Sequence, residues 1–289
     1  MNHFQSYKDI DTAIVNYNPE YHGKVLYLGF DVGRTHDATA IFLIGKMENG
    51  LKQTLNKYGF AFKKAYGQNF LTDETLLENI VDKAGVNKNT TVLEIGCGAG
   101  ALTKQLALKA KRVVGYEIDL KLKPILNEVL SEFKNTEIVY KDIMKENLSV
   151  LEEKLGKDYI MVANLPYYIT TPIILEFLEK AKNIKSMVIM VQEEVALRLV
   201  AKEGTSDYAA ITVALNIRGN SSIIEKVGRE KFTPIPKVDS AVVKIDIIRE
   251  KYTGIDYKAV RDLVRCAFNN RRKTFVNNFF IILSNSEFR

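Results

Sequence analysis

The sequence predicts an α/β fold with a mainly parallel, seven-stranded sheet and a small helical region near the C-terminus. Three observations support this fold class. Short apolar segments alternate with helical stretches from residue 91 onward, which is typical of parallel sheets with crossover helices. A glycine-rich turn joins the first of these segments to a helix. The last predicted strands have no long crossover between them, which predicts an antiparallel edge.

The first strand begins at Thr91 and runs into the glycine turn, and residues 101–111 have helical character. Strands at 112–117, 137–142 and 159–164 each end at a Glu, Asp or Asn. Further along, the sequence predicts a helix from 170 to 181, a strand at 187–191, a helix at 193–202, strands at 210–217 and 240–248, and a helix at 256–268.

Polar residues or glycine stand where four of these strands end, at Gly96, Glu117, Asp142 and Asn164. Ligands of open parallel sheets bind at the carboxyl ends of the strands, so these residues should converge on one crevice. Glycines let the backbone approach a ligand, and an acid about 20 residues later accepts the ribose hydroxyls of a nucleoside. Each acid alone is more often a solvated residue, and such glycine turns also occur in dinucleotide-binding domains. Their order along the chain favours a nucleoside pocket.

The segment Asn164-Leu165-Pro166-Tyr167 fits the methylation of an exocyclic base nitrogen. The amino lone pair of adenine is delocalised into the ring, so a catalyst has to hold this group in its tetrahedral, electron-rich form. An Asn side-chain oxygen and a nearby backbone carbonyl can do so, because Pro166 stiffens the turn and lacks an N–H. Tyr167 offers a ring on which a flipped base can stack. The alternative interpretation is a Pro turn with a core Tyr.

The composition suits a polyanionic partner without requiring one. The 289 residues carry a net charge of +6 with a pI of about 9.0, and basic residues contact phosphates regardless of base sequence. Most basic runs are equally well explained as solvated faces. Cys97 and Cys266 are far apart, and all His residues precede residue 37, so neither a zinc site nor a disulfide is predicted. The apolar runs are too short for a membrane helix, and a cytoplasmic protein is expected.

Six motifs follow one another between residues 64 and 274, at 64–71, 94–100, 116–119, 164–172, 232–240 and 267–274. Together they resemble the bacterial small-subunit (16S) ribosomal RNA adenine N6-dimethyltransferases, the KsgA family. The resemblance implies a Rossmann-like class I methyltransferase that uses S-adenosylmethionine as its methyl donor. It implies two adjacent adenines near the 3′ end of small-subunit rRNA as acceptors, and the immature small ribosomal subunit as partner. A monomer is expected.

The resemblance also implies which residues bind the cofactor. Asn69 and Leu71 would contact it from a segment that lies over the site, and Gly96 would pack against it. Glu117 would bind its ribose, and Asp142 would contact its adenine.

At the substrate, Asn164 would lie against the cofactor and hold the target amino group near the methyl, in a catalytic turn with Leu165 and Pro166. Tyr167 would stack on the base. Phe232 would cover its other face, although an aromatic residue before Thr-Pro is more often in the core. Three basic residues are expected to contact RNA, namely Arg271, Arg272 and Lys273. No metal site is predicted.

Other functions remain open at this point. An Erm-type large-subunit (23S) rRNA methyltransferase would share the fold, but the motifs at 232–240 and 267–274 favour the small-subunit enzyme. A catalytically impaired ribosome-assembly factor is a second alternative, against which the intact turn at 164–167 argues. A nicotinamide dehydrogenase is least favoured, because nothing in the sequence supplies an acid or base for hydride transfer.

The two ends of the chain depart from the family. Residues 1–46 have no counterpart in it, and 26–44 read as two apolar strands resembling the opening hairpin of ribonuclease-H-like nucleases and phage terminases. Asp31 would bind a metal there, but the other carboxylates of such a site are missing, so a non-functional fusion is expected. Residues 47–250 are assigned to the methyltransferase domain. Residues 251–289 are assigned to a truncated helical C-terminal domain, which leaves the mode of RNA docking open.

Overall fold

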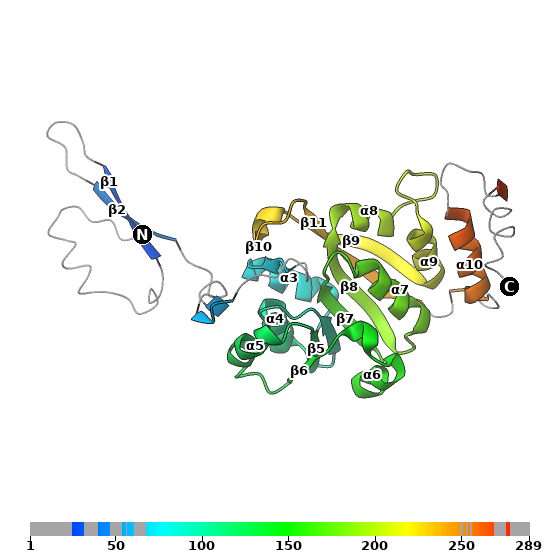
Figure 1. The fold of residues 1–289 in the computed structure, drawn as a ribbon, viewed down its shortest axis with the longest axis horizontal. Coiled ribbons are helices and arrows are strands. Elements are labelled where there is room, and N and C mark those ends of the chain that lie inside the picture. The colour runs from blue at the N-terminus through cyan, green and yellow to red at the C-terminus, as the bar shows by residue number, and fades with distance from the viewer. Residues whose placement is uncertain are drawn as a thin grey trace. The chain divides into compact units, whose positions relative to one another are not determined.

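The computed structural model describes residues 25–31, 40–46, 54–55, 57–60, 68–248, 251–252, 254, 256–268 and 276–277. The chain separates into two compact units, Met1–Phe60 and Ala61–Arg289 (Figure 1). In the first unit, strands β1 (Val25–Asp31) and β2 (Ala40–Lys46) pair antiparallel. The two apolar strands predicted for this segment are therefore present.

The second unit is built on a sheet with the strand order β6-β5-β4-β7-β8-β11-β9. Its strands are β4 (Thr91–Ile95), β5 (Arg112–Glu117), β6 (Thr136–Tyr140), β7 (Tyr159–Asn164), β8 (Ile184–Gln192), β9 (Gly219–Val227) and β11 (Ser240–Ile247). Strands β4 to β8 pair in parallel, whereas β11 runs antiparallel to both β8 and β9. The predicted mainly parallel sheet with antiparallel pairing near one edge is confirmed.

Helices cover both faces of this sheet (Figure 1). They are α3 (Glu74–Ala84), α4 (Ala101–Lys109), α5 (Lys123–Val129), α6 (Leu148–Leu155), α7 (Thr170–Lys180), α8 (Glu193–Leu199), α9 (Ala210–Arg218) and α10 (Tyr257–Phe268). Within the part of the chain that the structure describes, no helix has both the length and the apolar character needed to cross a membrane.

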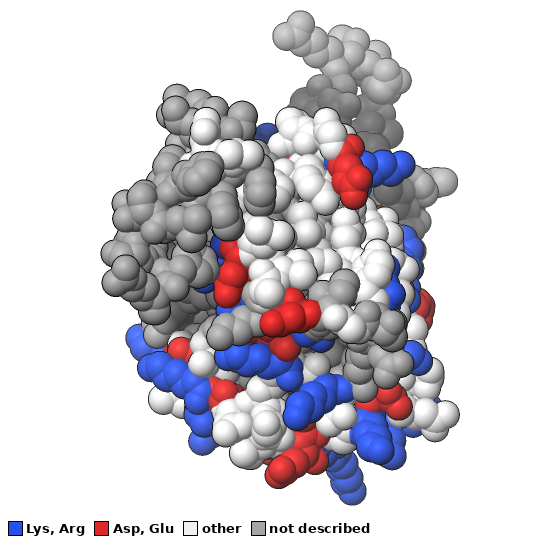
Figure 2. Space-filling model, turned by 90° about the vertical axis from the view of Figure 1, so that its right-hand side faces the viewer, with Lys and Arg blue, Asp and Glu red and all other residues white. Residues whose placement is uncertain are grey.

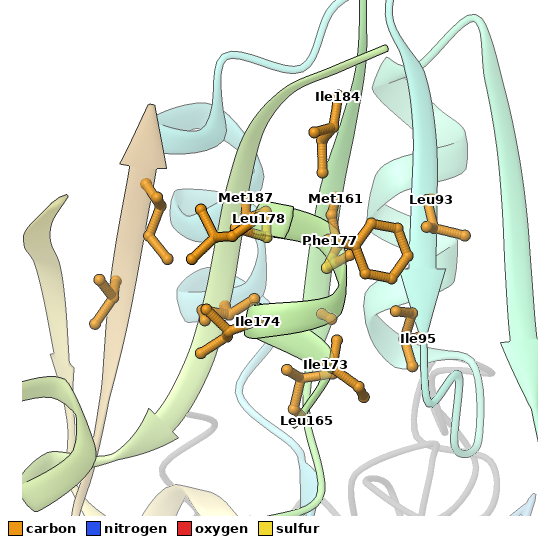
Figure 3. Packing of buried hydrophobic residues seen from close by; sticks show 14 of the residues in the cluster. Leu93, Ile95, Met161, Leu165, Ile173, Ile174, Phe177, Leu178, Ile184 and Met187 are labelled. Atoms are coloured by element: carbon orange, nitrogen blue, oxygen red, sulfur yellow. The ribbon is translucent and has the colours of Figure 1, made fainter. Parts of the chain in front are cut away.

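Successive strand residues point to opposite faces of a sheet, and the core divides accordingly. Leu93 and Ile95 of β4 belong to a cluster with residues of α6 and α7, whereas Val92 belongs to a second cluster with α3 and α4. In Figure 3, Phe177 of α7 lies beside Met161 of β7. Because both faces are covered, the carboxyl ends of the parallel strands are the place where this layered fold can receive a ligand.

The strand predicted at 210–217 is wrong, because these residues form α9. The seventh strand is instead β9, which the sequence analysis missed. The β-branched run in this segment favours a strand locally. Packing decides otherwise, since a helix places Thr212 and Leu215 on one buried face. The Thr212 hydroxyl also accepts from Ala209 N (3.0 Å) and donates to Arg198 O (2.6 Å).

The Glu152 carboxylate connects α6 to two neighbouring parts of the sheet. It is buried and accepts hydrogen bonds from the Tyr159 hydroxyl (3.2 Å), Lys182 N (2.9 Å) and Asn183 N (2.8 Å). Tyr159 begins β7, and the other two donors lie in the turn before β8. One side chain thus fixes the amino ends of two adjacent strands.

We expect Glu152→Ala to lower the free energy of unfolding by about 2–4 kcal/mol, because it leaves several buried donors without an acceptor. The neighbouring Glu153 is exposed, so Glu153→Ala should change it by less than about 0.5 kcal/mol. Both substitutions introduce the same helix-forming residue into α6. Urea unfolding measures the difference, and equal midpoints for the two variants would contradict the assigned role.

Candidate active site

The sheet opens at the carboxyl ends of β4 and β7. The chain passes from β4 to β5 and β6 on one side, then returns to place β7 on the other side of β4. The register of β4 with β7 includes Val92 opposite Ile160 and Leu93 opposite Met161, whereas β7 pairs with β8 as far as Asn164. Such a switch point is where open α/β sheets bind ligands.

The turn after β4 needs glycine at three positions with positive φ. The angles are 79° at Gly96, 56° at Gly98 and 85° at Gly100. A Cβ atom on Gly96 would lie 3.5 Å from the Asn164 carbonyl oxygen, and one on Gly98 would lie 3.0 Å from the Phe70 ring. The glycine turn therefore lies next to the end of β7 at Gly96 and packs tightly against Phe70 at Gly98, and the positive φ at each position favours glycine.

The Glu117 carboxylate at the end of β5 is held against the same turn. It is buried, and it accepts from Gly98 N (2.8 Å) and from Asp119 N (2.8 Å). Burial raises the pKa of Glu117, and the backbone N–H groups of Asp119 and Gly98 oppose this shift. Each carboxylate oxygen has a further lone pair, so the group can still accept hydrogen bonds from a ligand hydroxyl.

Residues 68–71, the cover segment, bridge the ends of β5 and β7. Gln68 Nε2 donates to Asp119 Oδ2 (3.0 Å), and Asn164 Nδ2 donates to Asn69 O (3.3 Å). Strand β3 (Phe70–Leu71) pairs antiparallel with β10 (Phe232–Thr233). Asn69 and Leu71 thus lie at the predicted edge, although the Leu71 side chain is itself buried in the core.

Asp142 follows β6 and lies farther along the edge. It is half-buried, and its Oδ1 accepts from Met144 N (3.0 Å) at the start of a short 3-10 helix, Ile143–Lys145. Because β6 pairs with β5, Asp142 is near the Glu117 side of the crevice and away from Asn164. The structure therefore places a second acid beside the Glu117 end.

The turn after β7 is tied to the start of α7. Leu165 is buried, and the Pro166 carbonyl accepts from Ile169 N (3.1 Å) and from the Thr170 hydroxyl (3.1 Å). A backbone carbonyl of this turn is expected to hold the amino group, and the Pro166 carbonyl is already used by these two bonds within the protein. The Tyr167 hydroxyl bonds to Ser240 Oγ (3.1 Å) at the start of β11, which fixes the position of its ring.

Phe232 is 2% exposed and belongs to the same apolar cluster as Leu71, which favours its interpretation as a core residue. Arg271, Arg272 and Lys273 lie outside the described residues. The sequence analysis gave no role to Gln68, Asp119 or Ser240, which hold the site together. All three stand within the recognised motifs, but no local pattern indicates their hydrogen-bond partners.

Behind the glycine turn lies a group of buried polar side chains. Burial raises the pKa of Glu94 to about 8, with the nearby Thr103 hydroxyl opposing the shift and Glu117 adding to it. Burial also raises the pKa of the Cys97 thiol, whose Sγ donates to Tyr116 O (3.7 Å). A buried thiol with a raised pKa stays protonated at neutral pH and is a poor nucleophile. No cluster of metal-ligating side chains occurs among the described residues.

A parallel sheet with this glycine turn, buried acid and Asn-Leu-Pro-Tyr turn defines a class I methyltransferase. These residues fit a nucleoside-containing cofactor, because Glu117 offers acceptors beside a turn with glycine at three of its five positions. The family model described as ribosomal RNA adenine dimethylase matches residues 59–288. The chain belongs to this family.

Relatives agree with that assignment. The chain is 45% identical over 231 residues to "Ribosomal RNA small subunit methyltransferase A" of Geobacillus thermodenitrificans, covering 78% of this chain and 79% of the relative. It is 41% identical over 240 residues to the protein of the same name from Bacillus licheniformis, covering 82% of each.

Two solved structures resemble the fold. A dimethyladenosine transferase from Plasmodium falciparum has a TM-score of 0.64 at 30% identity, covering 73% of this chain and 74% of that one. The 23S rRNA methyltransferase ErmE has a TM-score of 0.62 at 29% identity, covering 74% and 84%. The predicted fold class, the enzyme class and S-adenosylmethionine as the cofactor are confirmed, and ribosomal RNA is the substrate class.

The raised pKa of Glu94 predicts how stability depends on pH. The folded protein keeps a proton on Glu94 up to about pH 8, whereas the unfolded chain releases it near pH 4.5. Glu94 therefore contributes to the free energy of unfolding at low pH, and this contribution is lost as the pH rises from about 4.5 to about 8. Glu94→Gln, which stays neutral, should gain stability relative to the parent across this range.

Thermal unfolding between pH 4 and pH 9 tests this expectation, with exposed Glu203→Gln as the control. A difference between Glu94→Gln and the parent that stays constant with pH would show that Glu94 ionises normally.

Proposed function

We propose that this protein transfers methyl groups from S-adenosylmethionine to N6 of two adjacent adenines near the 3′ end of small-subunit rRNA. The orientation of the Asn164 amide carries this proposal. Its Nδ2 donates to Asn69 O (3.3 Å), so its Oδ1 is the end available to accept from an adenine amino group. The relatives named as small-subunit methyltransferases support the choice of rRNA.

S-adenosylmethionine supplies an electrophilic methyl group when it is bound. On the protein side, Glu117 accepts the ribose hydroxyls, and Asp142 contacts the adenine ring of the cofactor. Because Gly96 has no side chain, the cofactor can approach the backbone closely at this position. Asn69 and Leu71, in the cover segment, exclude water from the edge, which strengthens each of these hydrogen bonds.

At the target base, Asn164 Oδ1 and the Leu165 carbonyl accept from the amino group and hold its lone pair toward the methyl. The Pro166 carbonyl is already used by α7, so it serves to fix the turn. Tyr167 stacks on the base, and its bond to Ser240 keeps the ring in one orientation. Stacking of this kind contributes roughly 1–3 kcal/mol per base.

The proposed partner is the immature small ribosomal subunit, contacted by a cytoplasmic monomer. Its RNA is a polyanion, and the chain carries a net charge of +6. On the face shown in Figure 2, Lys and Arg side chains are most frequent in the lower part, where Asp and Glu side chains lie among them. Arg271, Arg272 and Lys273 are proposed to contact the RNA phosphates, and Phe232 to support the base pocket from the core. The large-subunit alternative is not favoured, since the relatives at 41–46% identity bear the small-subunit name.

Replacing Glu117 should weaken cofactor binding. Glu117→Ala removes charge-assisted acceptors from a buried position, and a loss of about 1.5–3 kcal/mol in binding free energy is expected. Calorimetric titration with S-adenosylmethionine measures it, with exposed Glu132→Ala as the matched control. Equal affinity for Glu117→Ala and the parent would show that Glu117 does not bind the ribose.

Replacing Asn164 should slow methyl transfer far more than it weakens cofactor binding. Loss of one preorganised hydrogen bond to the reacting group costs on the order of 10²–10³ in rate. Asn164→Ala and the exposed Asn89→Ala can be compared in single-turnover methylation of small ribosomal subunits that lack the modification. An Asn164→Ala variant that retains most of its rate would exclude Asn164 from the catalytic turn.

A further inference from the structure

Two adjacent residues of the cover segment contact opposite sides of the site. Gln68 Nε2 donates to Asp119 Oδ2 (3.0 Å) on the β5 side. The carbonyl of the next residue, Asn69, accepts from Asn164 Nδ2 (3.3 Å) on the β7 side. Consecutive Cα atoms are about 3.8 Å apart, so a shift of Gln68 also moves the Asn69 carbonyl. The bond to Asp119 and the bond to Asn164 are therefore mechanically linked.

The Asp119 end of this link is fixed. Asp119 is buried, and its Oδ1 accepts from Lys121 N (3.2 Å) at the start of a 3-10 helix, Leu120–Leu122. Its backbone N–H donates to Glu117 Oε1 (2.8 Å). Because both its side chain and its backbone are bonded, Asp119 offers Gln68 an acceptor in a constant position.

The cover segment is also fixed beyond Asn69. Phe70 and Leu71 pair with β10, and Thr72 N donates to Lys231 O (3.1 Å). These bonds hold the residues that follow Asn69, whereas Gln68 holds the side that precedes it. The Asn69 carbonyl thus lies between two anchors, and the anchor at Gln68 is a side chain that one substitution removes.

The Asn164 amide depends on the Asn69 carbonyl for its orientation. An Asn amide carries an oxygen and an NH2 group of similar size, so its hydrogen bonds decide which end points in which direction. Asn164 is half-buried, and its bond to Asn69 O directs Nδ2 at the cover segment. If this carbonyl moved away, a half turn of the amide would present N–H donors to an adenine amino group, which is itself a donor.

We propose that Gln68 is a positioning residue for methyl transfer. By binding Asp119, it holds the Asn69 carbonyl in the place where that carbonyl keeps Asn164 Oδ1 directed at the target amino group. This inference rests on the proposed function, which gives Asn164 its role at the base. In this role Gln68 acts through Asn69 and Asn164 and not on the base itself.

The first test compares Gln68→Met with Gln105→Met, a matched control at another half-buried Gln, in α4. Methionine has nearly the shape of glutamine but no donor. With unmethylated small ribosomal subunits, Gln68→Met should lower kcat on the order of tenfold, as expected for one hydrogen bond to a charged group. The KM for subunits and the Kd for S-adenosylmethionine should stay within about twofold of the parental values. Gln68→Ala should show the same loss, and Gln105→Met should match the parent.

A double-mutant cycle tests whether Gln68 acts through Asn164. Because Asn164→Ala already removes the amide, adding Gln68→Met to it should lower the rate by less than about twofold more. A residue that merely stabilised the fold would slow the parent and the Asn164→Ala variant by the same factor.

The orientation of Asn164 can also be measured in the free protein, without cofactor or RNA. The side-chain NH2 resonances of Asn164, assigned by their loss in Asn164→Ala, report its bond to Asn69 O. Gln68→Met should shift these resonances and speed the exchange of the amide protons with water. Gln105→Met should leave both unchanged.

Three results would each overturn the proposal and leave the proposed function intact. They are a parental kcat for Gln68→Met, the full tenfold effect of Gln68→Met in the Asn164→Ala background, and unchanged Asn164 resonances in Gln68→Met. A parent that does not methylate small subunits would instead contradict the proposed function. In that case the Asn164 resonances still decide whether Gln68 orients the amide.

Discussion

The contact between the glycine turn and the turn after β7 is the constraint on which the site depends. Gly96 has a φ of 79°, and a side chain there would point at the Asn164 carbonyl. Strands β4 and β7 are neighbours in the sheet, with Val92 opposite Ile160 and Leu93 opposite Met161, and this places the two turns side by side. Helices cover both faces of the sheet, so its carboxyl edge is the place where this fold can receive a ligand.

Two buried acids next to this contact illustrate how binding and stability oppose each other. Burial raises the pKa of both Glu94 and Glu117, and the Glu117 carboxylate further disfavours a charge on Glu94. The folded chain accommodates them by keeping Glu94 neutral and by giving Glu117 two backbone N–H donors. A desolvated, partly satisfied carboxylate is costly in the free protein, but it is ready to accept hydrogen bonds from a ligand.

The sequence was sufficient to predict which strand ends meet at one edge of the sheet, because its signals are local. Strand periodicity, the glycines with positive φ and the residues that end β5 and β7 lie within short segments, and the structure brings them to one edge. The helix at 210–218 was misread, since burial against other elements outweighs its β-branched residues. The bond from Tyr167 to Ser240 spans 73 residues, and that from Gln68 to Asp119 spans 51. Hydrogen bonds of such sequence separation depend on the complete fold.

The pairing of β3 with β10 has a consequence for how the chain is made. The Thr72 hydroxyl donates to Lys231 O across 159 residues, so the cover segment leaves the ribosome long before its partner strand. Contacts between such distant parts of a chain form slowly, after local structure. A nascent chain can therefore complete its glycine turn and β4–β7 layer while the edge is still open. The edge at the cover segment is therefore complete only after β10 has been synthesised.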